Sequence, residues 1–91
     1  AIEPNAAEAH YNLAGAHYLM GNHGRAAELY RQVLGIKPDD PETHAKLALS
    51  LVQLGQTREA QAEVQAALRL DPDNATARAV LQQLQRGALS R

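Results

Sequence analysis

The chain has 91 residues, with nine basic and ten acidic side chains and a formal net charge of −1. This balance produces no strong electrostatic field, so nucleic acids are poor default partners for the chain. No apolar run approaches the roughly 20 residues that a membrane-spanning helix needs, and no signal-peptide pattern opens the chain, so we expect no direct membrane insertion. The absence of cysteine excludes disulfide bonds and thiolate metal sites. These residues do not specify a compartment, although the lack of a signal or membrane segment slightly favours the cytoplasm.

The composition favours an all-α fold. The apolar residues are mostly Ala and Leu, and there are three Tyr but no Phe or Trp. Ala, Leu, Gln, Glu and Arg favour helices, whereas the β-branched and aromatic residues that favour strands are scarce. Apolar residues recur at helical spacing, and the pattern predicts five helices, at about residues 6–20, 23–35, 41–54, 57–70 and 75–87.

Local signals mark where these helices begin and end. Pro41 suits the first turn of the third helix, with Asp40 before it as the N-cap, and Asn74 is the equivalent cap of the fifth helix. Gly21 and Gly55 lie where the first and third helices must stop, because glycine adopts a left-handed conformation without a Cβ penalty. A proline ends the second and the fourth helix, because it cannot continue a helix.

The chain is organised by a constant period, which Pro4, Pro38 and Pro72 mark by their equal spacing. Residues 7–40 align with 41–74 without a gap and share nine identities, which indicates an internal repeat. The identical pairs are Glu8/Glu42, His10/His44, Leu13/Leu47, Ala14/Ala48, Gly21/Gly55, Ala26/Ala60, Leu34/Leu68, Pro38/Pro72 and Asp39/Asp73.

These features resemble the tetratricopeptide repeat, a helix–turn–helix unit of about 34 residues. The family's Trp-x2-Leu-Gly-x2-Tyr element is matched by His10, Leu13, Ala14 and His17, and again by His44, Leu47, Ala48 and Leu51. Its Ala-x3-Phe element is matched by Ala26 and Tyr30, and by Ala60 and Val64. The resemblance covers the whole chain and implies an all-α, right-handed helical-repeat solenoid. The small residues are expected to let paired helices approach closely.

The resemblance divides residues 1–91, taken as a single domain, into four parts. These are the tail of a preceding repeat at 1–5, repeats at 7–40 and 41–74, and a capping helix with a tail at 75–91. Residues 1–4 match the end of a second helix, so we expect a C-terminal fragment of a longer array. Gln82 and Gln85 occupy slots that would face a following helix, and two polar residues there indicate that the array ends at this point.

No group of residues indicates catalysis, a metal or a cofactor. His10 and His17 are seven residues apart, which separates them by about 10 Å along a helix, and zinc ligands must lie about 2 Å from one ion. The turn at residues 21–24 lacks the lysine and the preceding strand of a phosphate-binding loop. Neither Ser50 nor Ser90 stands in a nucleophile motif. We therefore expect a protein that is not an enzyme and needs no cofactor.

The resemblance implies a binding site for another protein. In the family, the first helix of each repeat lines a concave groove that holds a peptide or a partner's helix, so an interaction scaffold is the expected function. Carried over position by position, the groove residues are Tyr11, Asn12, Gly15, Tyr18, Lys46, Leu49, Val52 and Gln53. Further lining positions are Glu8, Leu19, Glu42, Ala45, Thr76, Ala79, Val80 and Gln83. The family's clamp for chaperone C-termini is not expected, because only Lys46 is basic among the positions that match it.

The alternative function is self-assembly into a homo-dimer. Without a preceding repeat, the apolar faces of Leu13, Leu29 and Val33 are expected to be exposed. A symmetric dimer would cover them.

Overall fold

The computed structural model describes residues 5–89, and the side chains of residues 5–87. Within this range the chain forms five α-helices: α1 Ala6–Leu19, α2 His23–Ile36, α3 Pro41–Gln53, α4 Thr57–Leu70 and α5 Ala75–Leu89. Each helix begins where the sequence predicts and ends within two residues of the predicted position. Residues 1–4 of the expected tail lie outside the described residues, as do Ser90 and Arg91.

The two predicted glycine stops have the same geometry. Gly21 and Gly55 adopt φ angles of 83° and 77°, in the left-handed region that favours glycine. After α1, the N–H of Asn22 donates to the carbonyl oxygen of His17 at 2.8 Å, and after α3, Gln56 donates to Leu51 at 2.9 Å. These bonds span five residues, as in a Schellman motif, and satisfy carbonyl groups that the helix ends leave free.

The predicted caps lie at the helix starts but act in different ways. The side-chain oxygen of Asn74 accepts a hydrogen bond from the backbone N–H of Ala77 at 2.8 Å, as an N-cap should. Asp40 has the extended backbone of an N-cap, but its carboxylate accepts from the hydroxyl of Thr43 instead of from a backbone N–H. Pro41 then occupies the first turn, where its missing N–H costs nothing.

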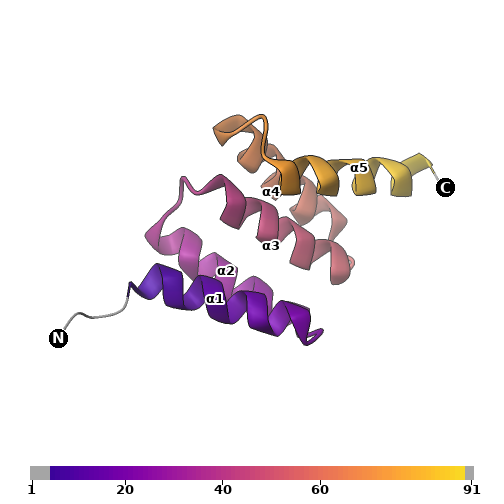
Figure 1. Cartoon of the computed structure of the whole chain (residues 1–91). Helices are drawn as coiled ribbons and strands as arrows, with labels where there is room; N and C mark the ends of the chain where they lie inside the picture. The colour runs from indigo at the N-terminus through magenta and orange to yellow at the C-terminus, as the bar shows by residue number, and fades with distance from the viewer. Residues whose placement is uncertain (1–4, 90–91) are drawn as a thin grey trace.

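The helices stack in chain order. In Figure 1, α1, α3 and α5 form one layer, and α2 and α4 lie behind it. The helix α1 packs on α2 and α3 on α4, while α2 contacts α3, and α5 packs on both α3 and α4. The principal extents of 54, 27 and 17 Å show an elongated molecule. The all-α helical-repeat fold expected from the sequence is confirmed.

Each helix pair buries small residues at equivalent positions of the repeat pattern. Ala14 and Ala26 between α1 and α2, and Ala48 and Ala60 between α3 and α4, are fully buried. Larger side chains fill the space around them, namely Leu29, Tyr30, Leu47, Leu51, Val64 and Val80. The alanines let the paired helices approach, and these larger residues supply most of the buried apolar area.

Equivalent leucines in the two helix pairs meet different surroundings. Leu47 of α3 is 2% exposed, within an apolar cluster to which all five helices contribute, whereas Leu13 of α1 is 45% exposed. The other two residues expected to be exposed, Leu29 and Val33, are buried, which corrects that expectation. The reason is geometric: the described helices cover both side chains, whereas Leu13 lies on a face of α1 that no described helix covers.

His44 stands at an aromatic position of the repeat pattern, and its side chain makes two hydrogen bonds there. Its Nδ1 lies 2.7 Å from Oε1 of Glu63, and its Nε2 donates to the carbonyl oxygen of Pro38 at 2.8 Å. The Glu63 contact crosses from α3 to α4, and the Pro38 contact holds the turn that precedes α3. His44 is therefore a structural residue.

Candidate binding groove

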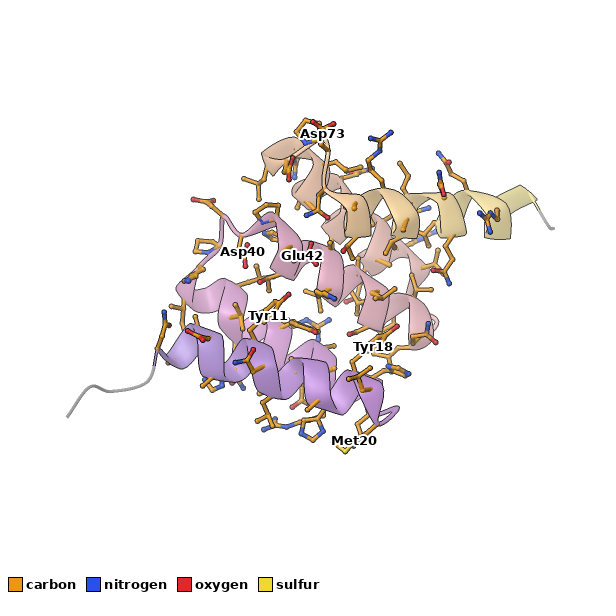
Figure 2. All side chains as sticks on the ribbon, viewed as in Figure 1. Tyr11, Tyr18, Met20, Asp40, Glu42 and Asp73 are labelled. Carbon is orange, nitrogen blue, oxygen red and sulfur yellow. The ribbon has the colours of Figure 1, made fainter. Side chains whose placement is uncertain are left out.

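A seam between α1 and α3 carries the residues expected to bind a partner. Tyr11 and Tyr18 are seven residues apart on α1 and therefore share one face of the helix. Figure 2 shows both on the side of α1 that faces α3, with Asp40 and Glu42 near Tyr11 and Met20 on the opposite side. Two hollows lie along this seam, one at each tyrosine.

The hollow near Tyr18, called here the Gly15 hollow, has a volume of about 490 Å³. Residues of α1 and α3 form most of its lining, and Tyr30 of α2 completes it. The lining residues are Asn12, Gly15, Ala16, Tyr18, Leu19, Tyr30, Lys46 and Leu49. Five of the eight predicted groove residues thus line one cavity. Tyr30 was not predicted to line the groove, although it matches the aromatic position of the repeat pattern.

Gly15 is not required by the packing of the described helices. A Cβ built on Gly15 would meet only the hydroxyl of Tyr30, at 3.9 Å, which is an ordinary van der Waals contact. The position is helical, and glycine there is less stable than alanine by up to about 1 kcal/mol. The equivalent residue in the next helix pair is Leu49, so this position of the repeat accepts a large side chain. The missing side chain at Gly15 leaves open space in the hollow.

The hollow near Tyr11, called here the acidic hollow, is smaller, at about 220 Å³. Three carboxylates and one ammonium group line it, so its charge is predominantly negative. The lining residues are Ala7, Glu8, Tyr11, Val33, Lys37, Asp40 and Glu42.

Two tyrosines next to these hollows, Tyr11 and Tyr30, titrate above their ordinary range. Burial raises the pKa of Tyr11, and the negative charges of Glu42 and Asp40 raise it further. Burial, followed by the neighbouring Tyr11, Tyr18 and Glu42, raises the pKa of Tyr30 to about 12. The rings of Tyr11 and Tyr30 pack edge to face with centroids 5.7 Å apart. The pair therefore links the linings of the two hollows to the buried core.

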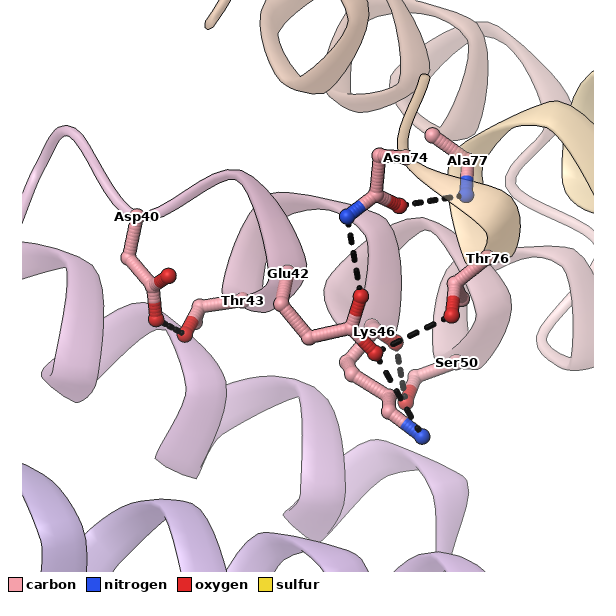
Figure 3. A network of polar contacts seen from close by, with 8 residues as sticks. All are labelled: Asp40, Glu42, Thr43, Lys46, Ser50, Asn74, Thr76 and Ala77. Carbon is pink, nitrogen blue, oxygen red and sulfur yellow. Dashed lines mark hydrogen bonds and ion pairs between the residues drawn. The ribbon is translucent and has the colours of Figure 1, made fainter. Parts of the chain in front are cut away.

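A polar network anchored on Glu42 ties α3 to α5, as Figure 3 shows. Its Oε1 accepts from the side-chain amide of Asn74 and its Oε2 from the hydroxyl of Thr76, both at 3.0 Å. The ammonium of Lys46, one turn along α3, lies 3.9 Å from Oε2. The capping role of Asn74 was readable from sequence, but these bonds join positions far apart in the chain and no local pattern signals them.

The other predicted lining residues lie apart from the Gly15 hollow. Tyr11 lines the acidic hollow, while Val52 lines a separate depression of about 700 Å³ with residues of α4 and α5. Gln53 is exposed at the end of α3. Two further positions, Ala45 and Val80, are fully buried and cannot line a groove, because α5 packs over this part of α3.

Within residues 5–89, no three His, Cys, Asp or Glu side chains gather closely enough to hold a metal ion. None of the helices in that range has the length and apolar character needed to cross a bilayer.

The helix pairs, their buried alanines and their glycine stops agree with one family model. The model of the tetratricopeptide repeat matches residues 19–84, which is most of the chain. The chain belongs to the tetratricopeptide repeat family. Repeats of this family generally mediate protein–protein interactions and form non-enzymatic scaffolds. A comparison with curated proteins found no match to the chain.

The matched segment begins at the end of α1, so most of that helix precedes it. The helix α1 nevertheless packs on α2 as α3 packs on α4, and the equivalent alanines of the two pairs are fully buried, namely Ala14, Ala26, Ala48 and Ala60. One wall of the Gly15 hollow therefore comes from a helix that the family model matches only at Leu19.

Proposed function

We propose that this chain is a protein-interaction module that binds an extended segment of a partner protein in the seam between α1 and α3. The observation that carries the proposal is the Gly15 hollow. It combines apolar surface from Tyr18, Leu19 and Leu49 with the polar groups of Asn12 and Lys46. An apolar centre with a few polar groups at its edge is the usual anatomy of a binding site for a partner.

The exposure of Leu19 supports the same proposal. Its side chain is 88% exposed at the end of α1, where it lines the hollow. A large aliphatic side chain beside an apolar hollow is an anchor for a partner's side chain, because covering both removes apolar surface from water. Lys46 and Asn12 can hydrogen-bond the backbone of an extended segment, which presents unpaired N–H and C=O groups.

The test uses the substitution Gly15→Leu, whose new side chain would fill the Gly15 hollow. Random-peptide phage are selected on the immobilised chain, and the affinities of the selected peptides are measured by fluorescence anisotropy. We expect Gly15→Leu to weaken binding by about tenfold or more, since the new side chain occupies space that the peptide needs. Thermal stability should not fall, because leucine favours a helix more than glycine does.

Gly35→Leu is the matched control for this test. Gly35 is a helical glycine of α2 with open space around its Cβ position, and it lines neither hollow. The control should bind like the wild-type chain. Equal affinities for Gly15→Leu and Gly35→Leu would place recognition elsewhere and refute the groove proposal.

A second candidate function, self-assembly, is favoured by the outer face of α1. Leu13 is 45% and Met20 63% exposed there, although Leu47, the equivalent of Leu13, is covered by neighbouring helices. The occupant in this case would be the same face of a second copy, in a symmetric dimer. This face lies away from the groove, as the position of Met20 in Figure 2 shows, so the two functions are separable by mutation.

A further inference from the structure

We infer that the segment bound in the groove carries a basic side chain, which enters the acidic hollow, and an apolar side chain about three residues away, which enters the Gly15 hollow. This inference rests on the proposed groove and names the chemistry of its occupant. It follows from the charges, the aromatic surface and the spacing of the two hollows.

More carboxylate side chains than ammonium side chains line the acidic hollow. Glu8, Asp40 and Glu42 line it with Lys37 as the one ammonium group among the described residues that form its wall. Lys46 reaches Glu42 from the neighbouring hollow, but at 3.9 Å the contact is at the limit of an ion pair. A cationic ligand group would therefore gain Coulomb energy here, whereas an added carboxylate would be repelled.

Glu8 is the carboxylate that remains available to such a cation. Asp40 already accepts from Thr43, and Glu42 accepts from Asn74 and Thr76. Glu8 is exposed, and among the described residues it has neither an ion-pair partner nor a side-chain hydrogen bond. It can therefore pair with a ligand cation without breaking a contact of the fold.

Tyr11 adds an aromatic surface to the same hollow. Its ring lies among the carboxylates, as the raised pKa of its hydroxyl also indicates. A lysine or arginine side chain is attracted both to carboxylates and to the face of an aromatic ring. This combination favours a basic side chain over a neutral one.

The spacing of the hollows sets the spacing of the two ligand side chains. Tyr11 and Tyr18 stand seven residues apart on one helix, which corresponds to about 10 Å at about 1.5 Å per residue. An extended chain advances about 3.3 Å per residue, so about three residues connect the two hollows. The Gly15 hollow offers Tyr18, Leu19 and Leu49, which suit an aliphatic or aromatic side chain.

The experiment uses short fluorescent peptides that differ at two positions about three residues apart. One peptide carries Lys and Leu, a second Glu and Leu, and a third Lys and Ser. Anisotropy titrations with the wild-type chain should show the Lys/Leu peptide binding about fivefold or more tightly than either of the others. The preference over the Glu/Leu peptide should shrink as salt is added, because exposed charges are screened.

Glu8→Lys should abolish the preference for the Lys/Leu over the Glu/Leu peptide, and Glu8→Gln should give an intermediate value. Glu28→Lys is the matched control, because it makes the same change in net charge at another exposed glutamate. Glu28 lies on α2, where it pairs with exposed Arg25, and it lines neither hollow. The control should keep the wild-type preference.

The outcomes separate this inference from the proposed function. Equal binding of the Lys/Leu and Glu/Leu peptides, or tighter binding of the Glu/Leu peptide, would overturn the basic-ligand inference. The same holds if none of the three binds. In each case the groove proposal would stand as long as phage-selected peptides still lose affinity with Gly15→Leu. If no peptide depends on Gly15, both proposals fail.

Discussion

At the scale of single residues, Tyr30 connects the core with the groove. Its ring packs against Tyr11 within the apolar cluster, and its hydroxyl is the atom nearest to a Cβ at Gly15. The groove thus has a floor made by a core residue. A change in the charge of Tyr30 should consequently affect the stability of the fold.

The raised pKa of Tyr30 predicts that the fold loses stability at alkaline pH. Its pKa is raised from 10.0 to about 12, so between these values the unfolded chain releases a proton that the folded chain retains. The free energy of unfolding should therefore be unaffected below about pH 10 and fall as the pH rises toward 12, by at most about 1.4 kcal/mol per pH unit. Urea unfolding of the wild-type chain and of Tyr30→Phe, followed by circular dichroism at pH 8, 10 and 11, measures this loss.

Tyr30→Phe keeps the ring and removes the ionisable group, so its stability should fall less steeply above pH 10. Groups that are present in both proteins cancel in the comparison. The same alkaline slope in both proteins would show that Tyr30 does not cause the loss.

At the scale of helices, each helix pair buries the same small residues, but its outer surface depends on its neighbours. Leu13 and Leu47 are the same residue at the same repeat position, and they differ only in what covers them. This difference separates a position that is buried in the described fold from one that is largely open to solvent.

Leu47→Ala should lower the free energy of unfolding by about 2–5 kcal/mol, because it removes a buried side chain and leaves a cavity. Leu13→Ala should cost less than about 1 kcal/mol, since its side chain is largely exposed. Thermal melts at neutral pH measure both, with about 4–8 °C expected per kcal/mol for a domain of this size. Similar shifts for the two variants would mean that Leu13 is covered in solution.

At the scale of the whole molecule, the chain presents two separate surfaces. The groove between α1 and α3 is open along the seam, and the outer face of α1 exposes Leu13 and Met20. Each repeat mainly contacts its neighbours, so covering the outer face would extend the stack of helices without closing the groove.

Self-assembly makes a distinct prediction for this outer face. If a second copy covers it, the sedimentation coefficient should rise with protein concentration. A double variant Leu13→Glu with Met20→Glu should then remain monomeric throughout, because the added charges would be buried at the contact. Gly15→Leu, which changes only the groove, should associate like the wild-type chain. A constant monomer mass for the wild-type chain would exclude this function.

The sequence by itself determined the helices and the repeat. Helix ends are governed by interactions over a few residues, such as the left-handed glycines at Gly21 and Gly55, and these signals are local. The alanines of the repeat pattern also identified buried positions within each pair, since small side chains let two packed helices approach. Five of the predicted groove residues line the Gly15 hollow together, because residues one or two turns apart share a helix face.

The tertiary structure decided what those positions contact. The bonds from Glu42 to Asn74 and Thr76, and from His44 to Glu63, join residues 19 to 34 positions apart, where no sequence period reveals a partner. Packing of α5 buried Ala45 and Val80, which the register alone placed in the groove. Leu13 is exposed and Leu47 is buried for the same reason, because neighbouring helices cover only Leu47. A repeat pattern gives each residue its direction on a helix, whereas burial depends on which helix lies opposite.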